Sequence, residues 1–117
     1  MPALTSKIDK RADEFQTNRS EMLEKLAEFE ELMEQSRQGG GPKYIERHRS
    51  RDKLLARERL ELLLDRDTPF LELSSLAGWG SDFPIGGNAV TGIGVVSGVE
   101  VAISAHDPTS RAGSSNP

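Results

Sequence analysis

The chain has 117 residues and a net charge of −4 at pH 7, with 35% hydrophobic and 29% charged residues. This length allows one small domain with a limited core, and the acidic balance disfavours nonspecific binding to nucleic acid or anionic membranes. The absence of cysteine excludes disulfides and thiolate metal sites. No apolar run has the length of a signal core or a membrane span, so we expect a cytoplasmic location.

Residues 1–38 are predicted to form one heptad-patterned helix, from about Lys7 to Arg37. The segment has no glycine or proline after Pro2 and carries a net charge of −3 (six basic against nine acidic side chains). Thr5 and Ser6 are the predicted caps of its start. Apolar residues recur every seven positions along it, at Ile8, Phe15, Met22 and Phe29. This stripe indicates that the helix packs on another helix or on the body of a protein.

Residues 39–66 are predicted to form two shorter helices. Gly39–Pro42 ends the first helix, because glycine terminates a helix and proline cannot continue one. The second helix follows at once and breaks near Ser50–Asp52; the third runs from Ala56 to Leu64, and residues 65–69 form a turn. This region carries a net charge of +3. A phosphate-binding face is one interpretation of its basic residues, and a solvated face with salt bridges to the interleaved acidic residues is the favoured one.

Residues 67–117 show strand patterns. Phe70–Leu73 alternates like a strand, and a glycine-containing loop follows it. Val90–Val96 and Val99–Ser104 flank Ser97-Gly98, which predicts a β-hairpin with a glycine turn. A two-stranded hairpin with so many apolar residues is unstable alone. After this hairpin the sequence predicts no further strand or helix that could cover it. The sequence therefore predicts an α+β chain of N-terminal helices and first strands that is cut off within a domain.

No catalytic residue and no metal ligand set is predicted. His48 and His106 have no acidic pair near them at metal-ligand spacing, so a structural or surface role is expected for both. Gly92-Ile93-Gly94 lacks the third glycine and the following helix of a dinucleotide-binding loop, and the hairpin explains these glycines better. The loop Asp107–Gly113 holds small residues around Arg111. It is either a ligand-approach loop or an ordinary connection.

Several segments, in this order and spacing, resemble the carboxyltransferase (β) subunits of biotin-dependent acyl-CoA carboxylases, of the methylcrotonyl-, geranyl- and propionyl-CoA carboxylase type. The matching segments are Gly39–Lys43, Glu46–His48, Arg51–Leu60, Leu62–Asp65, Thr68–Ser74, Thr91–Gly94 and Val96–Glu100. The chain departs from the family pattern at two places. Asp52 stands where a glycine is usual, and Ala112 follows Arg111 where glycines are more frequent.

The resemblance implies the N-terminal helices and first strands of a crotonase-like domain. It implies transfer of a carboxyl group from carboxybiotin to an acyl-CoA, with the biotin carried by a partner α subunit and with a homo-oligomeric β subunit. The backbone amides that stabilise the reacting oxyanions would lie downstream of this chain, which alone would be inactive. Arg111, Ala112 and Gly113 would lie near the CoA nucleotide. The alternative hypothesis is a short helical interaction module that associates with a full-length carboxylase subunit.

Overall fold

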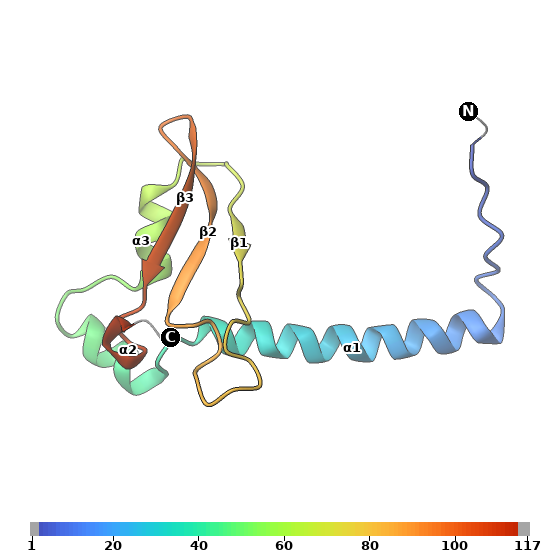
Figure 1. Ribbon diagram of the computed structural model, residues 1–117, viewed down its shortest axis with the longest axis horizontal. Helices are drawn as coiled ribbons and strands as arrows, with labels where there is room; N and C mark the ends of the chain where they lie inside the picture. The colour runs from blue at the N-terminus through green and yellow to red at the C-terminus, as the bar shows by residue number, and fades with distance from the viewer. Residues whose placement is uncertain (1–2, 115–117) are drawn as a thin grey trace. The chain divides into compact units, whose positions relative to one another are not determined.

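The computed structural model describes residues 3–114, which form three helices, three strands and one short 3₁₀ turn (Figure 1). The elements in chain order are α1 (Asp13–Arg37), α2 (Pro42–Arg49), α3 (Ala56–Leu63), β1 (Leu71–Leu73), β2 (Ala89–Val96), β3 (Val99–His106) and the turn η1 (Arg111–Gly113). The chain divides into two compact units, one up to Glu31 and one from Leu32 onward. None of the helices within residues 3–114 is both long and apolar enough to cross a lipid bilayer.

Helix α1 begins at Asp13, six residues later than the predicted Lys7, and the predicted caps Thr5 and Ser6 are therefore wrong. The reason lies at Asp9, whose carboxylate accepts a hydrogen bond from the Arg11 amide (2.9 Å) and whose carbonyl accepts one from the Ala12 amide (3.2 Å). Aspartate competes in this way for amides that a helix would otherwise use. No residue of α1 is buried in this structure, so the packing of its apolar stripe stays a prediction.

Helices α2 and α3 occupy the predicted positions within one residue. Pro42 opens α2, and the chain reverses at Asp52, whose φ of +53° is left-handed, as an aspartate in place of a glycine allows. At the start of α3, Glu58 accepts hydrogen bonds from the Leu55 amide (2.7 Å) and from Arg49 (2.6 Å). These two bonds, the amide bond first, lower the pKa of Glu58. The two helices are thus connected by a capped turn.

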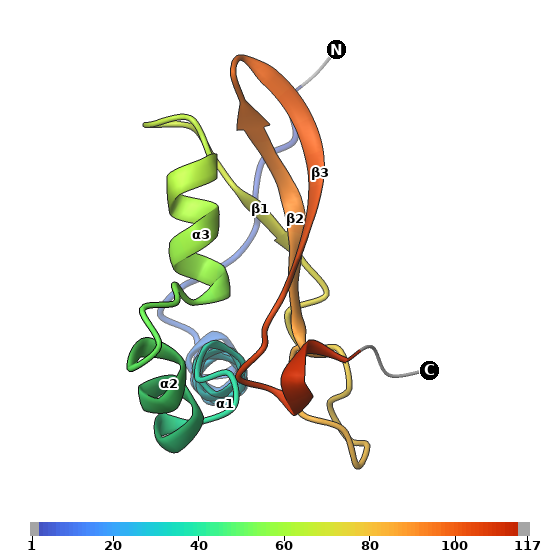
Figure 2. The same ribbon diagram turned by 90° about the vertical axis from the view of Figure 1, so that its left-hand side faces the viewer.

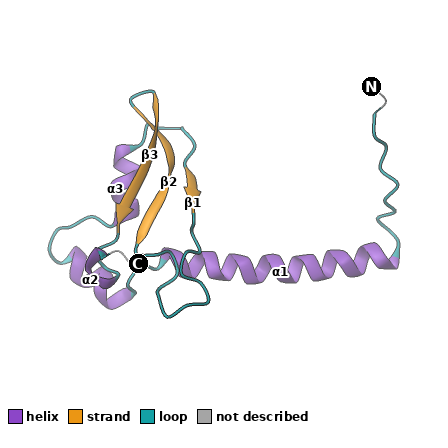
Figure 3. Cartoon of the chain, in the orientation of Figure 1, coloured by secondary structure: helices purple, strands orange, loops and turns teal. Residues whose placement is uncertain are grey.

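The strands form one antiparallel sheet in the order β1-β2-β3 (Figure 3). Ile93 in the middle strand faces Leu71 of β1 and Ala102 of β3. The turn between β2 and β3 consists of Ser97 and Gly98, both with positive φ (52° and 78°), as a two-residue hairpin turn requires. The predicted hairpin is confirmed, and β1 extends it to three strands.

Helix α3 packs on one face of this sheet (Figure 2). The buried core consists of Ala56 and Leu60 from α3, together with Val90 and Ala105 from the sheet. The expectation that the sheet lies uncovered was therefore wrong for this face, because a helix that precedes the hairpin covers it. The opposite face is open to solvent in this structure, where Leu71 is 60% exposed.

The Asp65 carboxylate, just after the end of α3, is hydrogen-bonded to the hairpin turn. Its two carboxylate oxygens accept hydrogen bonds from the Ser97 and Gly98 amides, each at 2.7 Å. We expect Asp65→Asn to lower the free energy of unfolding by about 1–2 kcal/mol, because an amide can accept only one of these bonds and leaves one donor unpaired. Urea unfolding followed by circular dichroism measures the change. Asp82→Asn, in an exposed loop, is the matched control, and an equal loss in both variants would contradict the role of Asp65.

Candidate functional site

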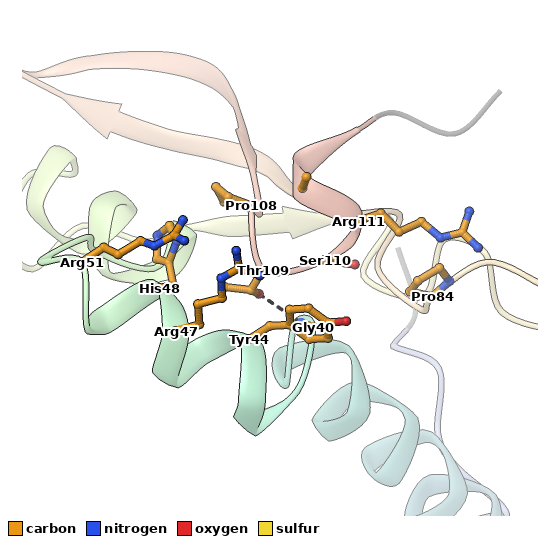
Figure 4. Close-up of a pocket in the computed structure, with 12 residues that line it drawn as sticks. Gly40, Tyr44, Arg47, His48, Arg51, Pro84, Pro108, Thr109, Ser110 and Arg111 are labelled. Atoms are coloured by element: carbon orange, nitrogen blue, oxygen red, sulfur yellow. Dashed lines mark hydrogen bonds between the residues drawn. The ribbon is translucent and has the colours of Figure 1, made fainter.

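Helix α2 and the turn after it present a row of side chains to an open pocket of about 530 Å³ (Figure 4). Tyr44, Arg47, His48 and Arg51 occur at spacings of three and four residues, which places them on one side of a helix. The facing wall is the loop 108–112 that follows β3. Two segments far apart in the sequence therefore enclose one open pocket.

A second open pocket, of about 700 Å³, continues the first past His48 and Arg51 and adds Lys53 and Arg59 to the lining. We call the two pockets together the cationic groove; its basic side chains are Arg47, His48, Arg51, Lys53, Arg59 and Arg111. Asp52 is the acidic residue among its lining side chains. The groove concentrates positive charge in a chain whose net charge is −4, and such a concave cationic surface attracts anions.

The favoured interpretation of the basic region as a salt-bridged surface holds for two of its arginines. Arg49 pairs with Glu58 (2.6 Å) and Arg57 with Glu72 (2.7 Å). Across the part of the chain that the structure describes, by contrast, no salt bridge involves Arg47 or any other basic residue of the groove. The charges of the groove's arginines and lysine are therefore available to a ligand, whereas the interpretation favoured from the sequence was a salt-bridged surface for the whole basic region.

The predicted site residues Arg111, Ala112 and Gly113 form the left-handed turn η1, with φ values of 43°, 56° and 76°. Arg111 and Ala112 line the groove, whereas Gly113 accepts a hydrogen bond through its carbonyl from Nδ1 of His106 (2.9 Å). The Arg111 guanidinium lies over the ring of Phe83, 5.2 Å from its centroid, a cation–π contact that holds it at the rim. His106 thus has the structural role expected for it.

Buried polar side chains hold the loop that carries Arg111. The Ser110 hydroxyl donates to the side-chain carbonyl of Asn88, and the Asn88 amide donates to the Ser114 carbonyl (2.9 Å). The Asp107 amide donates to the Asn88 carbonyl (2.8 Å). Asn88 and Ser110 are both buried, and buried polar groups that satisfy one another specify one conformation. The loop is therefore preorganised, although nothing in its sequence marked Asn88 as its partner.

The chemistry of the groove is that of an anion-binding site. Guanidinium groups bind phosphate or carboxylate oxygens through paired hydrogen bonds, and the half-exposed ring of Tyr44 offers a face for stacking. Over residues 3–114 no group of three or more His, Cys, Asp or Glu side chains lies close enough together to hold a metal ion. The arrangement can bind and orient a polyanionic ligand.

Comparison with protein families finds one matching family model, described as the carboxyl transferase domain, over residues 47–117. Among curated proteins, the chain is 50% identical over 114 residues to a probable biotin-dependent acyl-coenzyme A carboxylase beta2 subunit of Mycobacterium tuberculosis. It is 46% identical over 117 residues to a probable mitochondrial methylcrotonoyl-CoA carboxylase beta chain of Drosophila melanogaster. Each match covers 97% of this chain, which spans 22% and 20% of the lengths of these relatives.

Solved structures show the same relationship. The beta subunit of Pseudomonas aeruginosa geranyl-CoA carboxylase superposes with a TM-score of 0.86 at 38% identity, over 97% of this chain and 22% of that subunit. A transcarboxylase 12S structure with methylmalonyl-coenzyme A bound superposes with a TM-score of 0.63 at 30% identity, over 81% of this chain and 19% of that protein.

Proposed function

We propose that this chain, which belongs to the carboxyl transferase domain family, forms the N-terminal part of a carboxyltransferase subunit of a biotin-dependent acyl-CoA carboxylase. The whole protein would transfer a carboxyl group from carboxybiotin to an acyl-CoA and would act as a homo-oligomer with a biotinylated α subunit. The alternative of a helical interaction module is not favoured, because the relatives match 97% of the chain, sheet included.

The cationic groove would receive the nucleotide end of the acyl-CoA. The observation that carries this proposal is that Arg47, Arg51 and Arg111, from two segments far apart in the sequence, line one open groove. Coenzyme A carries a diphosphate and a 3′-phosphate, and arginine is well suited to such groups because its planar fork forms two parallel hydrogen bonds. Tyr44 would stack on the adenine ring. The left-handed turn Arg111–Gly113 would then lie beside the bound nucleotide.

Biotin would reach the enzyme on its carrier domain rather than bind to this groove. Carboxybiotin carries a single carboxylate, whereas coenzyme A carries several phosphate charges, and the guanidinium groups that line the groove match the phosphates better. Residues 3–114 would therefore bind and orient the acyl-CoA, and we place the amides that stabilise the enolate and the biotin oxyanion outside them. These residues would anchor the substrate at its nucleotide end, away from the reacting thioester.

Neutralising two groove arginines tests the proposal. We expect the double variant Arg47→Gln/Arg51→Gln to bind coenzyme A about thirty- to eight-hundredfold more weakly than the unaltered chain, since each of the two charged hydrogen bonds lost costs roughly 1–2 kcal/mol. Isothermal titration calorimetry at two salt concentrations measures the affinity. The affinity of the double variant should also depend less on the salt concentration than that of the unaltered chain. Arg66→Gln, in an exposed turn, is the control. Equal affinity in all three chains, or no binding by the unaltered chain, would contradict the proposal.

A further inference from the structure

The glycine segment that ends α1 also contacts the loop after β3. The Gly40 amide donates a hydrogen bond to the Thr109 hydroxyl (3.0 Å). A Cβ atom at Gly40 would overlap the Thr109 carbonyl, and one at Gly39 would lie 2.5 Å from a carboxylate oxygen of Asp107. Gly40 is therefore required by the close approach of two backbone segments, and Gly39 leaves room for the Asp107 side chain, in addition to ending the helix.

The Thr109 hydroxyl bridges Gly40 and Asp107, because it both accepts and donates a hydrogen bond. It accepts the bond from Gly40 and donates to Oδ1 of Asp107 at 2.6 Å, and the same carboxylate oxygen accepts the Thr109 amide at 2.8 Å. Thr109 is only 5% exposed. A buried hydroxyl that both donates and accepts a hydrogen bond is fixed in one rotamer. Its loss would leave the Gly40 amide unpaired and would remove one of the two hydrogen bonds to Oδ1 of Asp107.

The bridge joins the two walls of the cationic groove. Gly40 stands two residues before Pro42, where α2 begins with the row of Tyr44 and Arg47, and Thr109 lies in the opposite wall beside Arg111. Figure 4 shows the Gly40–Thr109 bond between these walls. We propose that Thr109 is a positioning residue, whose hydroxyl sets the separation of α2 from the loop that carries Arg111 and so adjusts the groove to its ligand. This inference rests on the proposed function of the groove.

Two substitutions of Thr109 distinguish the effect of its hydroxyl group from the effect of its packing. Thr109→Val keeps the shape but loses the bridge, so coenzyme A should bind about tenfold more weakly; Thr109→Ser keeps the hydroxyl and should restore the affinity to within about twofold. The exchange of the Gly40 amide with deuterium, measured by NMR, should be about tenfold faster in Thr109→Val alone. The matched control is Thr91→Val, which also removes a threonine hydroxyl bond, to Ser104 (3.3 Å), but on the sheet; it should leave the affinity unchanged.

The outcomes distinguish the positioning role from the function of the groove. If Thr109→Val binds coenzyme A as tightly as the unaltered chain, or if Thr109→Ser fails to restore the affinity, the positioning role is overturned while the groove's function stands. If the unaltered chain does not bind coenzyme A, the proposed function fails, and the rates of amide hydrogen–deuterium exchange then test the positioning role of Thr109. In that case faster exchange at Tyr44 and Ile45, in the first turn of α2, supports the positioning role, and unchanged exchange there overturns it.

Discussion

Replacing Gly92 with alanine is expected to lower the free energy of unfolding by about 3 kcal/mol, the upper part of the usual range for overpacking. Gly92 is a buried position of the middle strand. A Cβ atom there would overlap the ring of Phe70 and lie 2.6 Å from the Leu71 carbonyl oxygen. The ring could turn aside, but the carbonyl belongs to the neighbouring strand, so the added methyl group would force β1 away from β2.

A second glycine provides the control for this expectation. At Gly98 an added Cβ meets nothing within 4 Å, and only its φ of +78° resists a side chain. Gly98→Ala should therefore cost about 1 kcal/mol from backbone conformation alone. Urea unfolding of both variants, followed by circular dichroism, gives the two values. A loss at Gly92 no larger than the loss at Gly98 would contradict the steric argument.

The second large effect is expected at the ion pair between α3 and β1. Arg57 donates two hydrogen bonds to the two carboxylate oxygens of Glu72, at 2.7 and 2.8 Å, in a partly buried setting. Glu72→Gln should destabilise the fold by about 2 kcal/mol, because the arginine loses its counterion and part of the paired geometry. The effect stays below that of a fully buried pair because solvent still reaches both side chains. Glu61→Gln, at an exposed position of α3, is the control and should change stability by less than about 0.5 kcal/mol.

The pair also predicts a pH dependence with a definite sign. The hydrogen bond from Arg57 holds the pKa of Glu72 below its ordinary value, and partial burial opposes this shift less strongly. The unfolded chain, with an ordinary carboxyl pKa of about 4.3, then binds the proton more readily than the folded one. The stabilisation is therefore complete above about pH 5 and fades as the pH falls through the lowered pKa. In Glu72→Gln the slope of unfolding free energy against pH should be shallower in this acidic range; an unchanged slope would contradict the assignment.

Much of the fold could be predicted because its signals are local. Pro42 and the glycines before it mark a helix boundary, and Ser97-Gly98 marks a hairpin turn, so these elements lie where the sequence places them. The predicted start of α1 was wrong because the side chain of Asp9 accepts a hydrogen bond from a backbone amide that a helix would otherwise use. The α+β class and the crotonase-like assignment agree with the solved carboxyltransferase β subunits that superpose on this chain.

The candidate site could be predicted only in part because it is formed by tertiary contacts. Arg111 was singled out by its loop of small residues and by the family resemblance, and the structure places it in the lining of the groove. Arg47 and Arg51 were interpreted as parts of a salt-bridged surface, because a sequence shows which charges are neighbours along the chain and not which ones pair. Glu58 pairs with Arg49 because the turn between α2 and α3 brings these two side chains together, and this arrangement is not visible in the spacing of charges along the chain.

The bond between Gly40 and Thr109 spans 69 positions of the chain, and this separation has a consequence for the order of folding. Closing so long a loop costs more entropy than forming either helix or the hairpin, whose contacts are local. During synthesis from the N-terminus, α2 leaves the ribosome long before the loop that faces it. The helices and the hairpin should therefore form early and the groove late, so a nascent chain would acquire its ligand affinity only after most of its secondary structure is in place.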